Sequence, residues 1–216
     1  IHEPDSVPGL VNRTMSRWAA QASAAFKEAQ EHLKVSAFFH TGNPLRGTMG
    51  FIDKDSALAA MGLVAWKDQK PVLFVGGGSQ GAQTINRAVV DIIPTLIEEW
   101  DVKVIHQTGQ KLYDDCLSQL DSRFHAHERY VIRPYFDNMP DILAISDVAV
   151  CRAGSLTLSE LSVSGVPSIL VPYPYAAADH QKENALAYRR AGVSVMIEDK
   201  DLSSVKLKNT LEALLI

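Results

Sequence analysis

Three loops rich in glycine, hydroxyl and amide groups could bind a phosphorylated ligand. The first, VGGGSQGA at residues 75–82, lies between an apolar run and a helical pattern. Glycine at Gly78 would let the backbone approach a ligand closely, and the Ser79 hydroxyl can donate to a phosphate oxygen. A helix starting here would add free N–H groups and a positive dipole end. The stretch is not a P-loop, and its match to GxGxxG at Gly76, Gly78 and Gly81 is weak, so a tight turn explains it equally well.

The second loop, CRAGSLTLSEL at residues 151–161, leads from an apolar run into a helix that carries one carboxylate. Ser155 and Thr157 are natural N-cap residues. The spacing of Thr157 and Glu160 is that of a capping box, in which the glutamate reaches back to the cap N–H, and the spacing alone favours this interpretation. The alternative is a second anion-binding helix N-terminus, with Glu160 accepting hydrogen bonds from a ribose diol.

The third loop is VPYPYAAADHQKENAL at residues 171–186. Asp179 is a plausible N-cap, and Gln181 and Asn184 would share one face of the helix that follows. Amides both donate and accept hydrogen bonds, which suits sugar hydroxyls. His180 is weakly informative, because a lone histidine is more often a surface or packed residue than a catalyst.

One cation lies near these candidate anion sites. Arg46 belongs to TGNPLRG at residues 41–47, where Asn-Pro predicts a turn. A surface arginine without a ligand is the simpler interpretation of this residue taken alone.

Short β-branched runs alternate with helical patterns from about residue 71 onward. The runs lie at 71–75, 102–106, 129–132, 147–151, 167–173 and 193–197, and the helical patterns lie near 82–99, 110–120, 137–145, 156–164, 180–191 and 201–214. This alternation predicts an α/β fold, a Rossmann-like doubly wound parallel sheet. Ligands of such sheets bind at the carboxyl ends of the strands, so we expect the three loops to converge there.

The helix after the glycine loop has an apolar stripe, formed by Ile85, Val89, Ile92 and Leu96. Pro94 lies inside this pattern and predicts a kink or a break. The first 70 residues have a different pattern. It predicts an Ala-rich helix at 16–33, a short strand and turn at 34–47, and a helix at 53–63. We expect this part to be a connector.

Composition limits the class of protein. The chain has 216 residues, 46% of them hydrophobic, and a formal net charge of −4, which gives no indication of nucleic-acid binding. Its two cysteines form no CxxC pattern and indicate a reducing compartment, without disulfides or a zinc site. We see no transmembrane run or signal peptide. The chain opens without Met, so we expect a piece of a longer protein.

Three stretches carry a resemblance to a known family: GGGSQGAQTIN, CRAGSLTLSELSVSGVPSILVPYPYAAADHQKENA and the opening IHEPDSVPGLVNR. Together they resemble glycosyltransferase family 28, the bacterial enzymes that transfer N-acetylglucosamine (GlcNAc) from UDP-GlcNAc to lipid-linked N-acetylmuramyl-pentapeptide in peptidoglycan synthesis. The resemblance implies a GT-B fold with two Rossmann-like domains. Residues 41–216 would be the C-terminal, donor-binding domain, and residues 1–40 a connector and remnant of the N-terminal, acceptor domain.

The resemblance also implies contacts to UDP-GlcNAc. It places Arg46 and Ser79 near the diphosphate, Phe136 over the uracil, Glu160 on the ribose hydroxyls and Gln181 on the GlcNAc hydroxyls. The full set of implied donor-binding residues is Asp5, Arg46, Gly78, Ser79, Phe136, Ser155, Leu156, Thr157, Leu158, Ser159, Glu160, His180 and Gln181.

Asp5 departs from the family pattern, which reads HEQN where this chain reads HEPD. The family's asparagine contacts the donor, whereas a carboxylate cannot donate a hydrogen bond as an amide does. It would also place a negative charge near a diphosphate.

The implied reaction is an inverting transfer by a hexosyltransferase at the cytoplasmic face of the bacterial inner membrane. The acceptor-lipid site, the membrane-facing patch and the candidate base would belong to the N-terminal domain, so we expect no catalytic residue in this chain. We expect the chain alone to be soluble, to bind UDP-GlcNAc weakly and to catalyse nothing. No DxD-like pair lies in a candidate loop, so we expect no cofactor and no tightly bound metal.

Three alternatives stay open. A UDP-GlcNAc epimerase shares the fold and the donor. A dinucleotide oxidoreductase would need an acidic residue about 20 positions after its glycine loop at the end of a second strand, whereas Glu98 and Glu99 precede the next strand. A non-catalytic nucleotide-sugar-binding module is the third.

Overall fold

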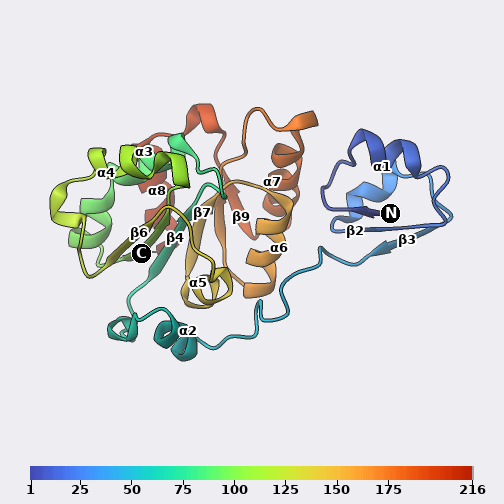
Figure 1. Ribbon diagram of the computed structural model, residues 1–216. Helices are drawn as coiled ribbons and strands as arrows, with labels where there is room; N and C mark the ends of the chain where they lie inside the picture. Colours follow the sequence, from blue (N-terminus) through green and yellow to red (C-terminus); the bar gives the residue numbers. More distant parts are fainter. Residues whose placement is uncertain (216) are drawn as a thin grey trace.

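The computed structural model describes residues 1–215, which form two parallel sheets (Figure 1). The larger sheet has six strands in the order β6-β5-β4-β7-β8-β9, and every neighbouring pair is parallel. Its strands are β4 (Val72–Gly76), β5 (Lys103–Gln107), β6 (Tyr130–Arg133), β7 (Val148–Cys151), β8 (Ser168–Leu170) and β9 (Ser194–Met196). Each of the six predicted runs supplies one strand, so the predicted α/β fold class is confirmed.

Helices connect these strands on both faces of the sheet. They are α2 (Lys54–Ala60), α3 (Gln83–Val90), α4 (Tyr113–Gln119), α5 (Met139–Ile145), α6 (Ser155–Ser164), α7 (His180–Arg190) and α8 (Ser204–Leu215). Short 3₁₀ turns are η1 (Lys27–His32), η2 (Val64–Trp66), η4 (Gln110–Leu112), η5 (Ser122–Phe124), η6 (Ala177–Asp179) and η7 (Asp199–Asp201). The break predicted near Pro94 is confirmed, because α3 ends at Val90 and a π-helical turn, η3 (Thr95–Glu99), follows the proline.

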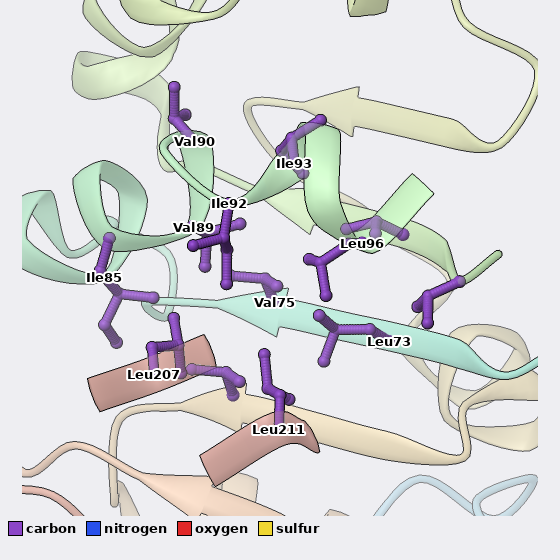
Figure 2. Packing of buried hydrophobic residues seen from close by; sticks show 14 of the residues in the cluster. Leu73, Val75, Ile85, Val89, Val90, Ile92, Ile93, Leu96, Leu207 and Leu211 are labelled. Carbon is purple, nitrogen blue, oxygen red and sulfur yellow. The ribbon is translucent and has the colours of Figure 1, made fainter. Parts of the chain in front are cut away.

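Successive residues of β4 point into two different cores. Leu73 and Val75 belong to one buried cluster, whereas Val72 and Phe74 belong to the other, as the alternation of side chains along a strand requires. Figure 2 shows the first cluster around β4. The predicted stripe of Ile85, Val89, Ile92 and Leu96 lies there with Leu207 and Leu211 of α8.

The strand order reverses direction at the centre of the sheet. From β4 the chain proceeds outward to β5 and β6, and it then returns to β7 on the other side of β4. The loops that follow β4 and β7 therefore diverge at the carboxyl edge and leave a crevice between them, where ligands of doubly wound sheets bind.

The first 40 residues contain a second, three-stranded sheet, and we call this part the N-terminal lobe. Its strands β1 (His2–Glu3), β2 (Gln21–Ala24) and β3 (Ala37–His40) pair in parallel, and α1 (Leu10–Met15) lies between β1 and β2 in the chain. The lobe has a small core of Ala22, Ala24, Ala29 and Leu33. Figure 1 shows it beside the main sheet, on the side of α6 and α7.

The Ala-rich helix predicted over residues 16–33 is wrong. The middle of this segment is β2, which pairs with β1 on one side and β3 on the other. Ala22 and Ala24 alternate into the lobe's core, so pairing and burial outweigh the high helix propensity of alanine. The helix predicted over 53–63 is confirmed as α2, with Asp53 accepting a hydrogen bond from the Ser56 N–H.

Cys116 and Cys151 are both buried and unpaired, as predicted. Burial raises the pKa of both thiols to about 12, which keeps them protonated. Among residues 1–215, no helix is long and apolar enough to cross a membrane.

A buried histidine joins β5 to its neighbours. His106 is fully buried, with Nδ1 at 2.7 Å from the Tyr130 hydroxyl and Nε2 at 3.1 Å from Asn86 Oδ1. The Asn86 amide in turn donates to the Thr108 carbonyl oxygen over 2.9 Å. Burial lowers the pKa of His106 from 6.5 to about 3, so the folded chain holds a neutral imidazole here.

This histidine makes the stability of the fold depend on pH. Below pH 6.5 the unfolded chain binds a proton on this imidazole, whereas the folded chain cannot bind it until about pH 3. Lowering the pH from 7.5 to 5 should therefore reduce the free energy of unfolding by about 2 kcal/mol through His106 alone. Urea titrations of the chain and of His106→Gln at both pH values measure this decrease in the free energy of unfolding. An equal decrease in both proteins would contradict the role of His106.

Candidate functional site

The crevice between the loops after β4 and β7 brings two predicted loops together. Gly78 from the first loop and Arg152, Thr157 and Glu160 from the second line one cavity of about 40 Å³, together with Gln107 at the end of β5. This cavity is far smaller than the roughly 300–1,000 Å³ of a drug-sized ligand pocket.

Helix α6 begins three residues earlier than the capping prediction requires. Its N-cap is Gly154, which has no side chain to cap the helix, and Thr157 and Glu160 are its third and sixth residues. A capping box needs its partners at the N-cap and the third position, so the predicted box between Thr157 and Glu160 is wrong. The N–H groups of Ser155, Leu156 and Thr157 have no partner within the helix and can face an anion.

Glu160 is partly buried in this crevice. Burial raises the pKa of its carboxyl, and the positive charge of Arg46 acts in the opposite direction. Arg46 comes from the segment that joins the N-terminal lobe to the main sheet, and its Nη1 donates to the Asp137 carbonyl oxygen over 2.8 Å. The predicted cation thus lies close enough to the predicted carboxylate for its charge to lower the pKa of Glu160.

The glycines at positions 81 and 78 of the first loop are explained by different constraints. Gly81 has φ of +77°, and a Cβ there would collide with the Thr108 carbonyl oxygen, so packing and turn geometry require this glycine. Gly78 has φ of +80°, but a Cβ there would meet nothing within 4 Å. Gly78 and the exposed Ser79 are therefore the part of the loop that a ligand can reach.

Gln107 fixes this loop, and sequence reasoning missed it. Its Nε2 donates to the Gly78 carbonyl oxygen over 3.3 Å, and its Oε1 accepts from the Phe136 N–H over 3.0 Å. Gln107 therefore ties the glycine loop to the loop between β6 and α5.

Arg152 is a second residue that sequence reasoning missed, although its place directly after β7 in CRAG was a signal. Its Nη1 donates to the carbonyl oxygens of Val171 (3.1 Å) and Pro172 (3.2 Å) and to Asp199 Oδ1 (2.5 Å). Its Nη2 donates to the Thr84 hydroxyl in α3 over 3.2 Å. One guanidinium thus joins the first turn of α3 to the end of β8.

The third loop reaches the same edge of the sheet. Gln181 Oε1 accepts from the Tyr173 N–H over 2.9 Å, and the Tyr173 ring lies 5.6 Å from the Arg152 guanidinium. Asp179 is the N-cap of α7, as predicted, but has a left-handed backbone and no side-chain cap bond. The Nδ1 atom of His180 is buried and has no partner among the described residues.

Three residues for which ligand contacts were predicted have buried side chains. Leu158 is fully buried in the core, and Phe136 is only 3% exposed within the same cluster. The neighbouring Tyr135 is 44% exposed. Asn184 is also fully buried, so its amide is not free for a sugar hydroxyl.

Two other predicted contacts are occupied within the protein. Asp5 Oδ1 accepts from the Asn184 amide over 2.8 Å. The Ser159 hydroxyl donates to the Ser155 carbonyl oxygen over 3.0 Å and accepts from the Asn43 amide over 3.1 Å. Within residues 1–215, no group of three or more His, Cys, Asp or Glu side chains could hold a metal ion.

Comparison with known proteins identifies the family of this chain. The family model described as the glycosyltransferase family 28 C-terminal domain matches residues 72–215. Two curated relatives bear the name UDP-N-acetylglucosamine--N-acetylmuramyl-(pentapeptide) pyrophosphoryl-undecaprenol N-acetylglucosamine transferase. The relative from Salinibacter ruber is 40% identical, covering 94% of this chain and 53% of its own length, and that from Bacillus subtilis is 34% identical, covering 100% and 58%.

Solved structures show the same fold. MurG from Acinetobacter baumannii superposes with a TM-score of 0.76 at 24% identity, covering 100% of this chain and 58% of that one. A UGT transferase from Siraitia grosvenorii, solved in complex with UDP, has a TM-score of 0.65 at 18% identity, covering 94% and 52%. The predicted GT-B type is confirmed, and the chain spans about half the length of the curated relatives it matches.

The missing capping box has a measurable consequence. Glu160→Gln should leave the free energy of unfolding at pH 7 unchanged or higher, because burial raises the pKa of this carboxyl and therefore disfavours its charged form in the fold. Loss of a capping interaction would instead lower stability by about 1 kcal/mol. Urea unfolding of the two proteins at pH 7 distinguishes these outcomes, and a decrease of that size would restore the capping interpretation.

Proposed function

Because the chain belongs to glycosyltransferase family 28, we propose that it is the donor-binding part of an inverting N-acetylglucosaminyltransferase. The names of its relatives give the substrates: UDP-GlcNAc as donor and a muramyl-pentapeptide on an undecaprenyl pyrophosphate carrier as acceptor. In this proposal residues 41–216 bind the donor, and residues 1–40 belong to the acceptor domain. The transfer to the C4 hydroxyl of the muramyl sugar requires the longer protein.

The observation that carries this proposal is the position of Glu160. It lies at the switch point of the sheet, beside Gly78 and behind the uncapped start of α6, and no capping bond occupies its carboxylate. A carboxylate at this place in a doubly wound sheet can accept hydrogen bonds from both ribose hydroxyls.

The charges nearby suit a departing diphosphate. The free N–H groups of α6, the Ser79 hydroxyl and the Arg46 guanidinium would stabilise the negative charge that develops on UDP as the sugar leaves. We place the GlcNAc near Gln181 and His180, whose unpartnered Nδ1 suits a sugar hydroxyl. The Tyr135 ring, rather than the buried Phe136, would cover the uracil.

Deprotonation of the acceptor hydroxyl needs a general base. We assign no base to this chain and place it in the acceptor domain. This half would then contribute donor binding and stabilisation of the leaving group, without a cofactor or a resident metal.

The acceptor's carrier lipid places the reaction at a membrane surface, on the cytoplasmic side where nucleotide sugars are found. The N-terminal lobe has features suited to anionic lipids, because Leu10, Val11 and Trp18 are each more than 70% exposed. Leu10 also lines a cavity of about 490 Å³ together with four basic side chains, Arg13, Arg17, His32 and Lys34. Apolar side chains among cations match the interfacial region of a bilayer.

Donor binding is the direct test. UDP-GlcNAc should raise the thermal unfolding midpoint of the 216-residue chain, whereas NAD should not, because NAD lacks the hexose for which Gln181 and His180 are proposed. Glu160→Ala should weaken UDP-GlcNAc binding at least tenfold, since hydrogen bonds to a charged group contribute about 1.5–3 kcal/mol. Calorimetric titration measures the affinity.

The matched control is Glu212→Ala, which removes a glutamate from α8, away from the carboxyl edge of the sheet. It should bind UDP-GlcNAc like the unmodified chain. Equal affinity of Glu160→Ala and Glu212→Ala would contradict the assignment, and stabilisation by NAD instead of UDP-GlcNAc would favour an oxidoreductase.

The lipid-facing surface has its own test. Arg13→Glu combined with Arg17→Glu should reduce co-sedimentation of the chain with phosphatidylglycerol vesicles severalfold, because each cation near an anionic surface contributes about 1 kcal/mol. Arg189→Glu on α7 combined with Lys206→Glu on α8 provides a matched charge change outside this surface. Equal binding by all three proteins would remove this lobe from the proposed membrane contact.

A further inference from the structure

Two side-chain amides connect the N-terminal lobe to the two helices that carry the proposed donor contacts. Asn43 connects the lobe to α6, and Asn184 connects it to α7. Ser159 and Asp5, which were predicted to contact the donor, are partners of these amides in the structure.

The first connection, the α6 clamp, is a chain of hydrogen bonds from β1 to α6. His2 Nε2 lies 3.0 Å from Asn43 Oδ1, and Asn43 Nδ2 donates to the Ser159 hydroxyl over 3.1 Å. Ser159 in turn donates to the Ser155 carbonyl oxygen over 3.0 Å. Because an amide oxygen only accepts, Nε2 of His2 is the donor, and each group in this series of hydrogen bonds has a defined donor or acceptor role.

The second connection, the α7 clamp, is a reciprocal pair. Asn184 Oδ1 accepts from the Ser6 N–H, and Asn184 Nδ2 donates to Asp5 Oδ1, both over 2.8 Å. The same Nδ2 lies 3.3 Å from the Ala153 carbonyl oxygen, in the loop that leads into α6. Since Asn184 is fully buried, loss of these partners would leave its polar atoms unsatisfied.

The lobe's side of the α7 clamp is itself held in place. Glu3 is 2% exposed, and its carboxylate accepts from the Asp5 N–H (2.9 Å), the Gly9 N–H (3.3 Å) and the Asn12 amide (2.9 Å). The loop that presents Asp5 and Ser6 therefore has a fixed shape, so the clamp can transmit the position of the lobe.

Each clamp holds its helix within one turn of a proposed donor contact. Ser159 precedes Glu160 directly, and Asn184 follows Gln181 by three residues, on the same side of α7. Other contacts across this interface lie farther along α7, such as the Phe26–Tyr188 ring contact and the exposed Glu28–Arg190 ion pair. The buried or bridging polar bonds are thus concentrated at the donor edge.

We propose that Asn43 and Asn184 are positioning residues that couple the placement of the N-terminal lobe to donor binding. The α6 clamp holds Glu160 for the ribose, and the α7 clamp holds Gln181 for the hexose. This inference rests on the proposed function, because it uses the same two contacts. By linkage, the bound donor must strengthen the clamps by the same factor as the clamps strengthen donor binding.

The two clamps predict different losses for UDP and UDP-GlcNAc. Asn43→Ala should weaken the binding of both ligands by a similar factor of about five or more, because both contain the ribose. Asp5→Ala, which removes a partly exposed partner of Asn184, should weaken UDP-GlcNAc by a comparable factor but leave UDP within twofold. Calorimetric titration of the 216-residue chain with each ligand measures both effects.

Three further variants separate positioning from a general loss of stability. Asp5→Asn keeps an oxygen that accepts from Asn184, so it should restore most of the affinity lost in Asp5→Ala. Ser159→Ala breaks the α6 clamp from the other side, so its effect should not add to that of Asn43→Ala. Glu28→Gln, which removes an exposed ion pair of the same interface, should change neither affinity.

Hydrogen exchange supplies a readout that does not depend on affinity. The Ser6 N–H is bonded to Asn184 in the α7 clamp, so UDP-GlcNAc should slow its exchange more than UDP does. The coupling would be overturned, while the proposed function stands, by either of two results. One is that Asp5→Ala loses equal affinity for UDP and for UDP-GlcNAc, and the other is that Asn43→Ala binds both ligands unchanged. If the unmodified chain bound neither ligand, the proposed function would fail, and this inference with it.

Discussion

The parallel pairing of β4 with both β5 and β7 is the constraint from which the rest of the structure follows. β4 is fully buried, and its alternate residues enter two different cores. The chain adds β5 and β6 on one side of β4, and it then returns to add β7, β8 and β9 on the other side. The loops after β4 and β7 must then separate at the carboxyl edge. The crevice that contains Gly78, Arg152 and Glu160 is therefore a consequence of topology, and the residue types in the loops give it its chemistry.

The start of α6 shows how this chemistry opposes stability. A serine, threonine, aspartate or asparagine at position 154 would cap the helix and contribute roughly a few tenths of a kcal/mol over glycine. The chain instead has Gly154, which leaves the first N–H groups open, and it places a carboxylate where burial raises its pKa. The open N–H groups and the partly buried carboxylate both lower the stability of the chain without ligand. They favour binding of a ligand that carries hydroxyls and negative charge. Local rules are commonly broken in this way at functional sites.

The sequence was most informative where the pattern is repeated and least informative where one residue decides. Six β-branched runs predicted six strands, because strands buried on both faces must be apolar throughout. The segment at 16–33 was misassigned, since four residues of β2 are too short to show a period and alanine fits either state. The capping box depended on which residue begins α6, and helix boundaries cannot be fixed to one residue by spacing. Phe136 and Tyr135 are adjacent aromatics, and only the packing of the loop after β6 decides which one is buried.

Residues that contact only other parts of the protein were the hardest to predict. Gln107, Arg152 and Asn184 join segments that are 29, 47 and 179 residues apart in the chain. No local pattern marks such a residue, because its partners are chosen by the fold. Asp5 illustrates the point: its charge argued against a diphosphate nearby, yet the structure gives its carboxylate an amide donor on α7. A substitution that looks unfavourable for a ligand contact is thus compatible with the fold, because an acceptor is all that Asn184 requires from this position.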